Sequence, residues 1–445
     1  MKTSDPATVA ARVSGLLQPL CEIASVLRLG RVTEVTPVLL SATLPGARMG
    51  ELCLVEPKGP KAEIVGLRQE TALLSPLGAT SGMRSGQLIR ALGHSYTICV
   101  GSHLIGHVVD GFGNILGGTS DVQVSEDAQT RALDGPAPDP LCRQIIAQPM
   151  FLGVKAIDAA MTIGRGQRVG IFAAAGVGKS TLLGMMCDGC GADVVVLALV
   201  GERGREVREF LEHTLTKSAR KRSVVVVATS DRPAAERLKA SYTATTIAEF
   251  FRDQGKDVLL LVDSLTRFAR AGREIAMAAG EPTSTSPFPP SVIARLAPLL
   301  ERSGCDAKGS ITAIYTILVE GDNPNEPLAD EVRSILDGHI ILSRKMAEAN
   351  RFPAIDVCAS VSRVMPLVVD REQLALAARL RALLSKYDEI SLLVRVGEYK
   401  EGFDEDADDA LNRHEGINEF LSQDKDERVE PDIVLKKLRE VVVGQ

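Results

Sequence analysis

The stretch Gly170-Ile-Phe-Ala-Ala-Ala-Gly-Val-Gly-Lys-Ser-Thr181 follows an apolar run at Arg168–Phe172 and precedes a helix-like run at Thr181–Met186. This is the pattern of a strand, a glycine-rich turn and the start of a helix. Glycines allow successive backbone N–H groups to curl around phosphate oxygens, and the start of a helix adds positive potential. The stretch therefore predicts a loop that binds the phosphates of a nucleoside triphosphate.

The residue types of this loop suit the parts of a magnesium-bound triphosphate. Lys179 is expected to reach the outer phosphates, and the Ser180 hydroxyl is expected to bind Mg²⁺. The usual pattern has Gly where this chain has Ala173, a position that serves turn geometry and that a small residue can occupy. The predicted nucleotide-binding residues are Ala174, Ala175, Gly176, Val177, Gly178, Lys179, Ser180 and Thr181.

The bulk composition narrows the class of protein. With 445 residues, 45% hydrophobic and 24% charged, the chain reads as a soluble protein of two or three domains. A net charge of −6, few aromatics and no Trp argue against a nucleic-acid-binding surface. The first residues lack the apolar core of a secretion signal, and no apolar run approaches a membrane-spanning length.

Short apolar runs broken by Gly and Pro fill the first hundred residues after a helix-like start at Val9–Leu20, and they predict a small β-barrel. A Pro-rich stretch at Asp134–Pro140 reads as a domain boundary. The last part is helical and acidic. The predicted segments are a leader (1–24), a β-barrel domain (25–100), a connecting segment (101–150), a P-loop domain (151–369) and a helical C-terminal domain (370–445).

Near-continuous Val, Leu and Ile runs in the P-loop domain alternate with helical patterns. Strands of this kind are buried on both faces, which is typical of a parallel sheet with helices on either side. We therefore expect an α/β fold with a central RecA-like parallel sheet. The predicted strands are Arg168–Phe172, Asp193–Val200, Ser223–Thr229, Val258–Asp263, Ser310–Val319 and His339–Leu342.

Two carboxylates follow strands of this predicted sheet. Asp263 ends an apolar strand and is a candidate for the magnesium shell, because ligands of α/β sheets bind at the carboxyl ends of strands. Glu202 follows the run Val194–Leu199 and is a candidate base for the attacking water. Arg203 beside it is a candidate phosphate clamp.

Several long motifs resemble the type III secretion ATPases, the injectisome and flagellar export enzymes related to the catalytic β subunit of rotary ATP synthases. The resemblance covers roughly residues 26 to 440. Its motifs are Gly166-Gln-Arg-Val-Gly-Ile-Phe172, Gly201-Glu-Arg-Gly-Arg-Glu-Val207, Asp263-Ser-Leu-Thr-Arg-Phe-Ala269 and Ala329-Asp-Glu-Val-Arg-Ser-Ile-Leu-Asp-Gly-His339.

The resemblance implies roles for matching positions. Glu202 is similar to the family's catalytic glutamate, and Asp263 to its strand-end aspartate. Arg363, in Ser360-Val-Ser-Arg-Val-Met365, resembles an arginine finger donated to the neighbouring subunit's nucleotide, which implies a ring, a homohexamer. Phe352, in Asn350-Arg-Phe-Pro-Ala354, matches an aromatic that stacks on adenine.

The chain also departs from the family pattern at three places. Ala174 stands where the family often has Gly, Ser286-Pro-Phe-Pro-Pro290 replaces Arg-Gly-Tyr-Pro-Pro, and Asn323-Pro324 replaces a more acidic pair. None of these changes removes a named catalytic group.

The function implied is Mg²⁺-dependent ATP hydrolysis that energises type III protein secretion by releasing chaperones and unfolding substrates. Implied partners are export chaperones, secreted substrates, and stalk and stator or regulator proteins, in the cytoplasm at the inner membrane. ATP is favoured over GTP because no Asn-Lys-x-Asp motif occurs. Val396-Gly-Glu-Tyr-Lys400 looks more like the injectisome branch.

Four alternatives stay open at this point. They are a flagellar export ATPase, the catalytic subunit of a rotary ATP synthase, a ring-shaped RNA translocase and a non-hydrolysing regulatory subunit. The predicted barrel segment Leu52–Leu74 has Lys58, Lys61 and Arg68 but no aromatics, which disfavours RNA. Glu202 disfavours a subunit that binds nucleotide without hydrolysing it.

Overall fold

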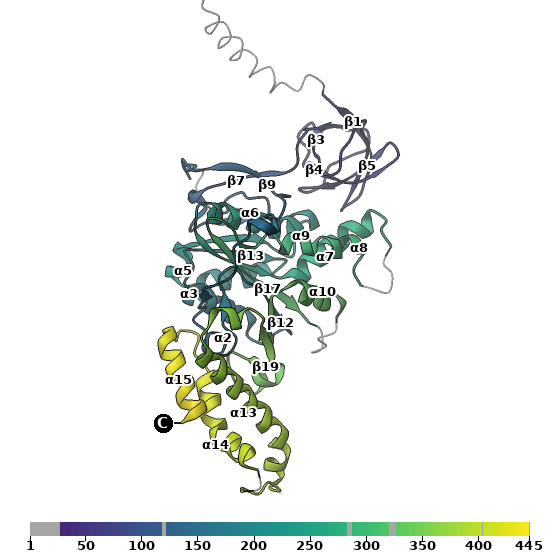
Figure 1. Ribbon diagram of the computed structural model, residues 1–445. Coiled ribbons are helices and arrows are strands. Elements are labelled where there is room, and N and C mark those ends of the chain that lie inside the picture. The colour runs from purple at the N-terminus through teal and green to yellow at the C-terminus, as the bar shows by residue number, and fades with distance from the viewer. Residues whose placement is uncertain (1–26, 118–121, 283–286, 320–325, 403, 445) are drawn as a thin grey trace, which may run out of the picture. The chain divides into compact units, whose positions relative to one another are not determined.

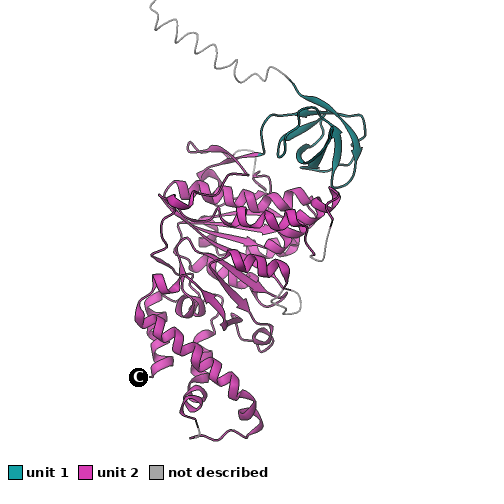
Figure 2. Ribbon diagram, turned by 45° about the vertical axis from the view of Figure 1, so that its right-hand side comes forward, with its two compact units in different colours: residues 1–96 teal, residues 97–445 magenta. Residues whose placement is uncertain are grey.

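The computed structural model describes residues 27–117, 122–282, 287–319, 326–402 and 404–444. It divides into two compact units between Tyr96 and Thr97, which are coloured separately in Figure 2. Three features identified in the sequence lie outside the described residues. They are the leader 1–24 with its helix at Val9–Leu20, Ser286 of the Ser286–Pro290 motif, and Asn323-Pro324.

The first unit contains a closed six-stranded antiparallel barrel in the order β1-β2-β5-β4-β3-β6. Its strands are β1 (Leu29–Val35), β2 (Leu40–Thr43), β3 (Leu52–Glu56), β4 (Lys61–Arg68), β5 (Thr71–Pro76) and β6 (Leu88–Ala91). Alternate side chains point inward, which is the two-residue period of a strand with one buried face. The interior is filled by Val32, Leu40, Ala42, Cys53, Val55, Ala62, Ile64, Leu74 and Ile89. The predicted small barrel is confirmed.

The second unit is built on one large sheet in the order β19-β18-β12-β17-β15-β13-β14-β8. Its strands are β8 (Val108–Asp110), β12 (Arg168–Ala173), β13 (Val194–Val200), β14 (Ser223–Ala228), β15 (Asp257–Asp263), β17 (Ser310–Leu318), β18 (Gly338–Leu342) and β19 (Ile355–Ser362). From β18 to β8 the neighbours pair in parallel, and β19 alone of this path runs antiparallel to β18. The predicted α/β fold with a central parallel sheet is confirmed.

The sheet recruits two strands that the sequence patterns did not assign to it. β8 comes from the predicted connecting segment and pairs with β14, and β19 closes the other end. β16 (Gly304–Cys305) joins the large sheet by pairing with β17. Two separate two-stranded sheets are formed by β7 (Thr97–Val100) with β9 (Gln129–Ala132) and by β10 (Pro149–Met150) with β11 (Ile163–Gly164).

Helices flank the sheet, as Figure 1 shows. α6 (Ala234–Asp253) packs on β13, β14 and β15, and α7 (Leu265–Ala278) packs on β17. α3 (Lys179–Gly189) contributes buried side chains to the core shared with β12 and β13. In the described part of the chain, no helix is long and apolar enough to cross a membrane.

The described part of the second unit also contains shorter helices. They are α2 (Lys155–Ala160), α4 (Gly204–Glu209), α5 (Lys217–Lys221), α8 (Pro290–Ala294), α9 (Leu296–Leu300), α10 (Pro327–Ile335), α11 (Arg344–Glu348) and α12 (Met365–Val368). A π-helical turn at Phe210–Thr214 continues α4, and 3₁₀ turns lie at Ser102–Leu104 and Pro140–Cys142.

Three helices follow the sheet: α13 (Arg371–Val396), α14 (Glu405–Leu421) and α15 (Pro431–Val443). They pack on one another and on α2, so their apolar side chains continue the core of the same unit. α13 runs for 26 residues. It ends at Val396 because Gly397 adopts φ 75°, a left-handed conformation that terminates helices.

Candidate nucleotide-binding and catalytic site

The glycine-rich loop forms the turn between the end of β12 at Ala173 and the start of α3 at Lys179. Gly176 and Gly178 have φ of 80° and 84°, values that favour glycine. Ala173 is the last residue of β12 and is not among the residues with positive φ, which explains why alanine is accepted there. Gly178 caps α3 without a side-chain hydrogen bond, so the first backbone N–H groups of the helix stay available for an anion.

The remaining loop residues divide between the core and the surface. Ala174 and Val177 are buried and anchor the turn. Four others face outward: Ala175, Gly176, Ser180 and Thr181 are exposed. The Ser180 hydroxyl and the loop backbone therefore share the surface on which phosphates would bind.

Both predicted carboxylates lie beside Lys179. Its Nζ forms an ion pair with Asp263 Oδ1 and lies 3.8 Å from Glu202 Oε1. Asp263 is the last residue of β15, Glu202 lies two residues after β13, and these strands are neighbours in the sheet. Thr316 of β17 donates its hydroxyl to Asp263 Oδ1 at 2.7 Å and fixes that carboxylate.

Glu202 is nearly buried, and burial raises its pKa to about 7. The negative charge of Asp263 acts in the same direction, whereas Lys179 and Arg267 lower the pKa. A carboxylate with a pKa near neutrality is suited to accept a proton from water.

Arg267 of α7 is a site residue that the sequence analysis missed. Its Nη2 lies 3.0 Å from Glu202 Oε2, and its Nη1 donates to the Gly201 carbonyl at 2.5 Å. A signal for it existed, since Arg267 stands four residues after Asp263 in the Asp263–Ala269 motif. On a helix that begins after a strand end, this position faces back toward the strand ends.

Arg203, the predicted phosphate clamp, points in another direction. Its guanidinium pairs with Glu206 at 2.8 Å, and 76% of its side chain is exposed. The structure thus brings together Lys179, Glu202 and Asp263, adds Arg267 and leaves Arg203 on the surface.

Arg363 lies at the opposite edge of the sheet from the phosphate loop, the edge formed by the amino ends of the parallel strands. Its N–H donates to the Asp337 carbonyl at 3.0 Å, and the Asp337 N–H donates to the Arg168 carbonyl at 2.9 Å. Arg168 begins β12, whereas the phosphate loop follows the end of that strand. Ala173, at the other end of β12, is five residues after Arg168. At about 3.3 Å per residue, the two ends of the strand are roughly 16 Å apart. Arg363 is exposed and cannot reach the phosphate loop of its own chain.

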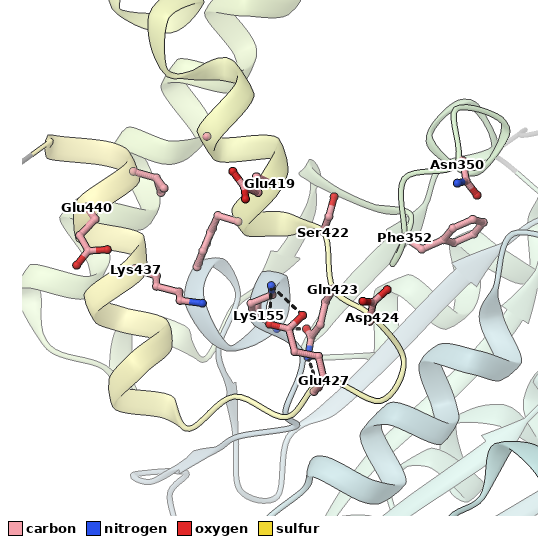
Figure 3. Close-up of a pocket in the computed structure, with 13 residues that line it drawn as sticks. Lys155, Asn350, Phe352, Glu419, Ser422, Gln423, Asp424, Glu427, Lys437 and Glu440 are labelled. Carbon is pink, nitrogen blue, oxygen red and sulfur yellow. Dashed lines mark hydrogen bonds and ion pairs between the residues drawn. The ribbon is translucent and has the colours of Figure 1, made fainter.

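Phe352 lies against the phosphate loop on the other side. A side-chain carbon built on Gly178 would lie 3.2 Å from two carbons of the Phe352 ring. The ring borders a cavity of about 690 Å³ whose far wall comes from the end of α14 and the segment before α15 (Figure 3). Among its lining residues are Lys155, Phe352, Phe420, Ser422, Gln423 and Asp424. Phe352 was predicted from the sequence, whereas this far wall was not.

Comparison with known proteins agrees with these observations. The family described as "ATP synthase alpha/beta family, nucleotide-binding domain" matches residues 153–362, and "T3SS EscN ATPase C-terminal domain" matches residues 369–440. The SPI-2 type 3 secretion system ATPase of Salmonella typhimurium is 53% identical over 93% of this chain and 95% of its own length. The flagellum-specific ATP synthase of Bacillus subtilis is 46% identical over 90% of this chain and 92% of its own.

A solved structure is also similar. The assembled ATPase EscN from the type III secretion system of enteropathogenic E. coli is 49% identical, covers 93% of this chain and 100% of its own, and gives a TM-score of 0.89. EscN in complex with its central stalk EscO gives 0.86 at 48% identity, with the same coverage of both chains. The resemblance predicted from the motifs is confirmed: the chain is an ATPase, and it belongs to the family of type III secretion ATPases.

Proposed function

We propose that this ATPase powers an injectisome-type secretion machine as a homohexamer, with each Mg²⁺-ATP bound between two protomers. One observation carries the proposal. Lys179, Glu202 and Asp263 converge beside the phosphate loop, while Arg363 lies at the opposite edge of the same sheet. A site assembled from both edges therefore needs two copies of the chain.

The residues present fit a magnesium ion. Ser180 is exposed in the first turn of α3, and the Asp263 carboxylate is buried at the end of β15, where it pairs with Lys179. Hydroxyl and carboxylate oxygens are the donors that Mg²⁺ prefers beside substrate phosphates. When bound, the ion neutralises charge on the phosphate oxygens, and Ser180 and Asp263 would hold it.

The chain's own groups then divide the work on the triphosphate. The loop backbone and Lys179 hold the phosphates, and Glu202 orients the attacking water and takes its proton. Arg267 fixes Glu202 through its 3.0 Å contact. Arg363 of the adjacent protomer contacts the outermost phosphate and stabilises the charge that develops there.

The adenine base is proposed to enter the cavity next to Phe352. The ring is 39% exposed and adjoins Gly178, so a base stacked on it stays connected to phosphates at the loop. The cavity volume of about 690 Å³ falls in the range of small-molecule sites.

Apolar side chains around Arg363 support a contact between protomers. Val361 and Leu367, on either side of it in the sequence, are 42% and 66% exposed. Aliphatic groups exposed next to a functional cation suit a surface that a second copy covers. The assembled state of EscN favours the same arrangement.

The proposed setting is the cytoplasmic face of the inner membrane. There the ring would release export chaperones and unfold secreted substrates, and it would engage a central stalk and a stator or regulator protein. The names of the secretion relatives and the complex of EscN with EscO support this setting. The higher identity to the SPI-2 ATPase than to the flagellar enzyme favours the injectisome branch.

ATPase activity measured against protein concentration tests this function. Activity per chain should rise with concentration, require Mg²⁺ and reach a plateau, because only neighbouring protomers complete a site. Activity per chain that stays constant on dilution, or that persists with EDTA in excess, would contradict the proposal.

Replacing the two candidate arginines separates their roles. Arg267→Ala should lower turnover by more than about tenfold because a charge-assisted hydrogen bond that orients Glu202 is lost. Arg203→Ala should change turnover less than about threefold, since an exposed ion pair contributes little. Steady-state kinetics of both variants at saturating ATP provide the measurement. A larger loss of turnover in Arg203→Ala than in Arg267→Ala would support Arg203 as the phosphate clamp.

A further inference from the structure

Gln423 connects three parts of the second unit. It lies in the segment between α14 and α15 and is 5% exposed. Its Oε1 accepts the Lys155 N–H at 2.8 Å. Its Nε2 donates to the Gly153 carbonyl and to the Glu427 carbonyl, both at 2.9 Å. A buried carboxamide with both N–H groups and its oxygen paired is held in one orientation.

The backbone of the same residue holds the loop that carries the aromatic ring. The Gln423 N–H donates to the Phe352 carbonyl at 2.9 Å. Phe352 lies against Gly178 of the phosphate loop. The far wall of the cavity and the ring that borders it are therefore joined through one residue (Figure 3).

The partners of the carboxamide lead to the helix that follows the phosphate loop. Gly153 packs against Gly189, so closely that a Cβ on Gly153 would lie 2.7 Å from the Gly189 Cα. Gly189 ends α3, which begins at Lys179. The ion pair between Lys155 and Glu427, at 3.1 Å, closes the same cluster and is nearly buried on the Lys155 side.

We propose that Gln423 is a positioning residue for recognition of the base. By fixing Phe352 relative to Gly153 and Lys155, it sets the spacing between the ring and the far wall of the cavity. It thus determines how much of the affinity for ATP comes from the base rather than from the triphosphate. The inference rests on the proposed entry of adenine beside Phe352.

The test compares a ligand that has a base with one that lacks it. Binding of adenylyl imidodiphosphate, a non-hydrolysable ATP analogue, and of inorganic tripolyphosphate is measured by calorimetry with Mg²⁺. The full-length chain carries Gln423→Ala or Gln423→Glu. Both variants should bind the nucleotide about tenfold more weakly, the scale of a lost base–aromatic contact, and tripolyphosphate as the wild type does. Gln423→Glu keeps the acceptor but sets a carboxylate against the Gly153 and Glu427 carbonyls.

Gln373→Ala is the matched control. Gln373 is also a buried glutamine, and its Nε2 donates to the Asp158 carbonyl and to Thr162 Oγ1 at the other end of α2. Gln373→Ala should lower the melting temperature about as much as Gln423→Ala does. It should not change the ratio of the affinities for adenylyl imidodiphosphate and tripolyphosphate. Equal weakening of both ligands by Gln423→Ala, or no change in either, would overturn the inference.

Phe352→Ala tests whether the base occupies the cavity, separately from whether Gln423 positions the ring. If it weakens binding of the nucleotide and not of tripolyphosphate, the base occupies the cavity, and the Gln423 variants then decide the positioning role alone. If it leaves the ratio of affinities unchanged, the assignment of the base to this cavity fails and the role of Gln423 fails with it.

Discussion

Glu202→Gln should bind ATP and fail to turn it over. The substitution keeps the size of the side chain but removes the carboxylate that we propose accepts a proton from the attacking water. General base groups contribute about 10²- to 10⁴-fold to rate, and a loss in that range is expected at saturating ATP. The proposed contacts of the loop and Lys179 with the triphosphate remain, so affinity for nucleotide should change little.

Glu209→Gln is the control for this variant. Glu209 also lies on the segment after β13, but it is exposed and pairs with Arg205 on the surface of α4. Its replacement should leave turnover near that of the wild type. Release of phosphate measures ATP turnover in both variants, and calorimetry measures their affinity for nucleotide. Equal loss of binding and turnover in Glu202→Gln would assign Glu202 a structural role.

Arg363→Ala should lower turnover by about 10³-fold or more, the typical contribution of an arginine finger. The residue lies at the edge of the sheet where β12 begins, so its removal leaves the phosphate loop of its own chain untouched. Binding of nucleotide to a dilute, unassembled chain should therefore stay at the wild-type value. The loss should appear only at protein concentrations at which the wild type is active.

Arg205→Ala provides the matched removal of an exposed arginine. It should preserve both turnover and the concentration dependence. If Arg363→Ala retained most of the wild-type rate, the arginine would not act on the nucleotide of a neighbour.

Much of the site followed from the sequence because its parts are local. The glycines, Lys179 and Ser180 lie in one loop. Asp263 and Glu202 each follow an apolar strand, and parallel strands bring such residues to one edge of the sheet. This is why the structure places both carboxylates beside Lys179.

Other parts of the site were not predicted from the sequence, although the position of Arg267 four residues after Asp263 offered a signal. The direction of Arg203 depends on Glu206 one helical turn ahead, and an exposed ion pair of this kind leaves little trace in the pattern. Arg267 acts through a contact between α7 and the end of β13. The far wall of the cavity beside Phe352 comes from residues about seventy positions after Phe352, and a backbone hydrogen bond joins it to the Phe352 loop.

Mixing two inactive variants tests most directly whether neighbouring chains share one site. Lys179→Ala lacks the lysine proposed to bind phosphate, and Arg363→Ala lacks the proposed arginine finger. In randomly mixed rings about a quarter of the interfaces would join an intact Lys179 to an intact Arg363 of the next protomer. ATPase activity should reappear on mixing, above that of either variant alone. A mixture as inactive as its components, under conditions in which wild-type chains assemble, would contradict a site shared between neighbouring chains.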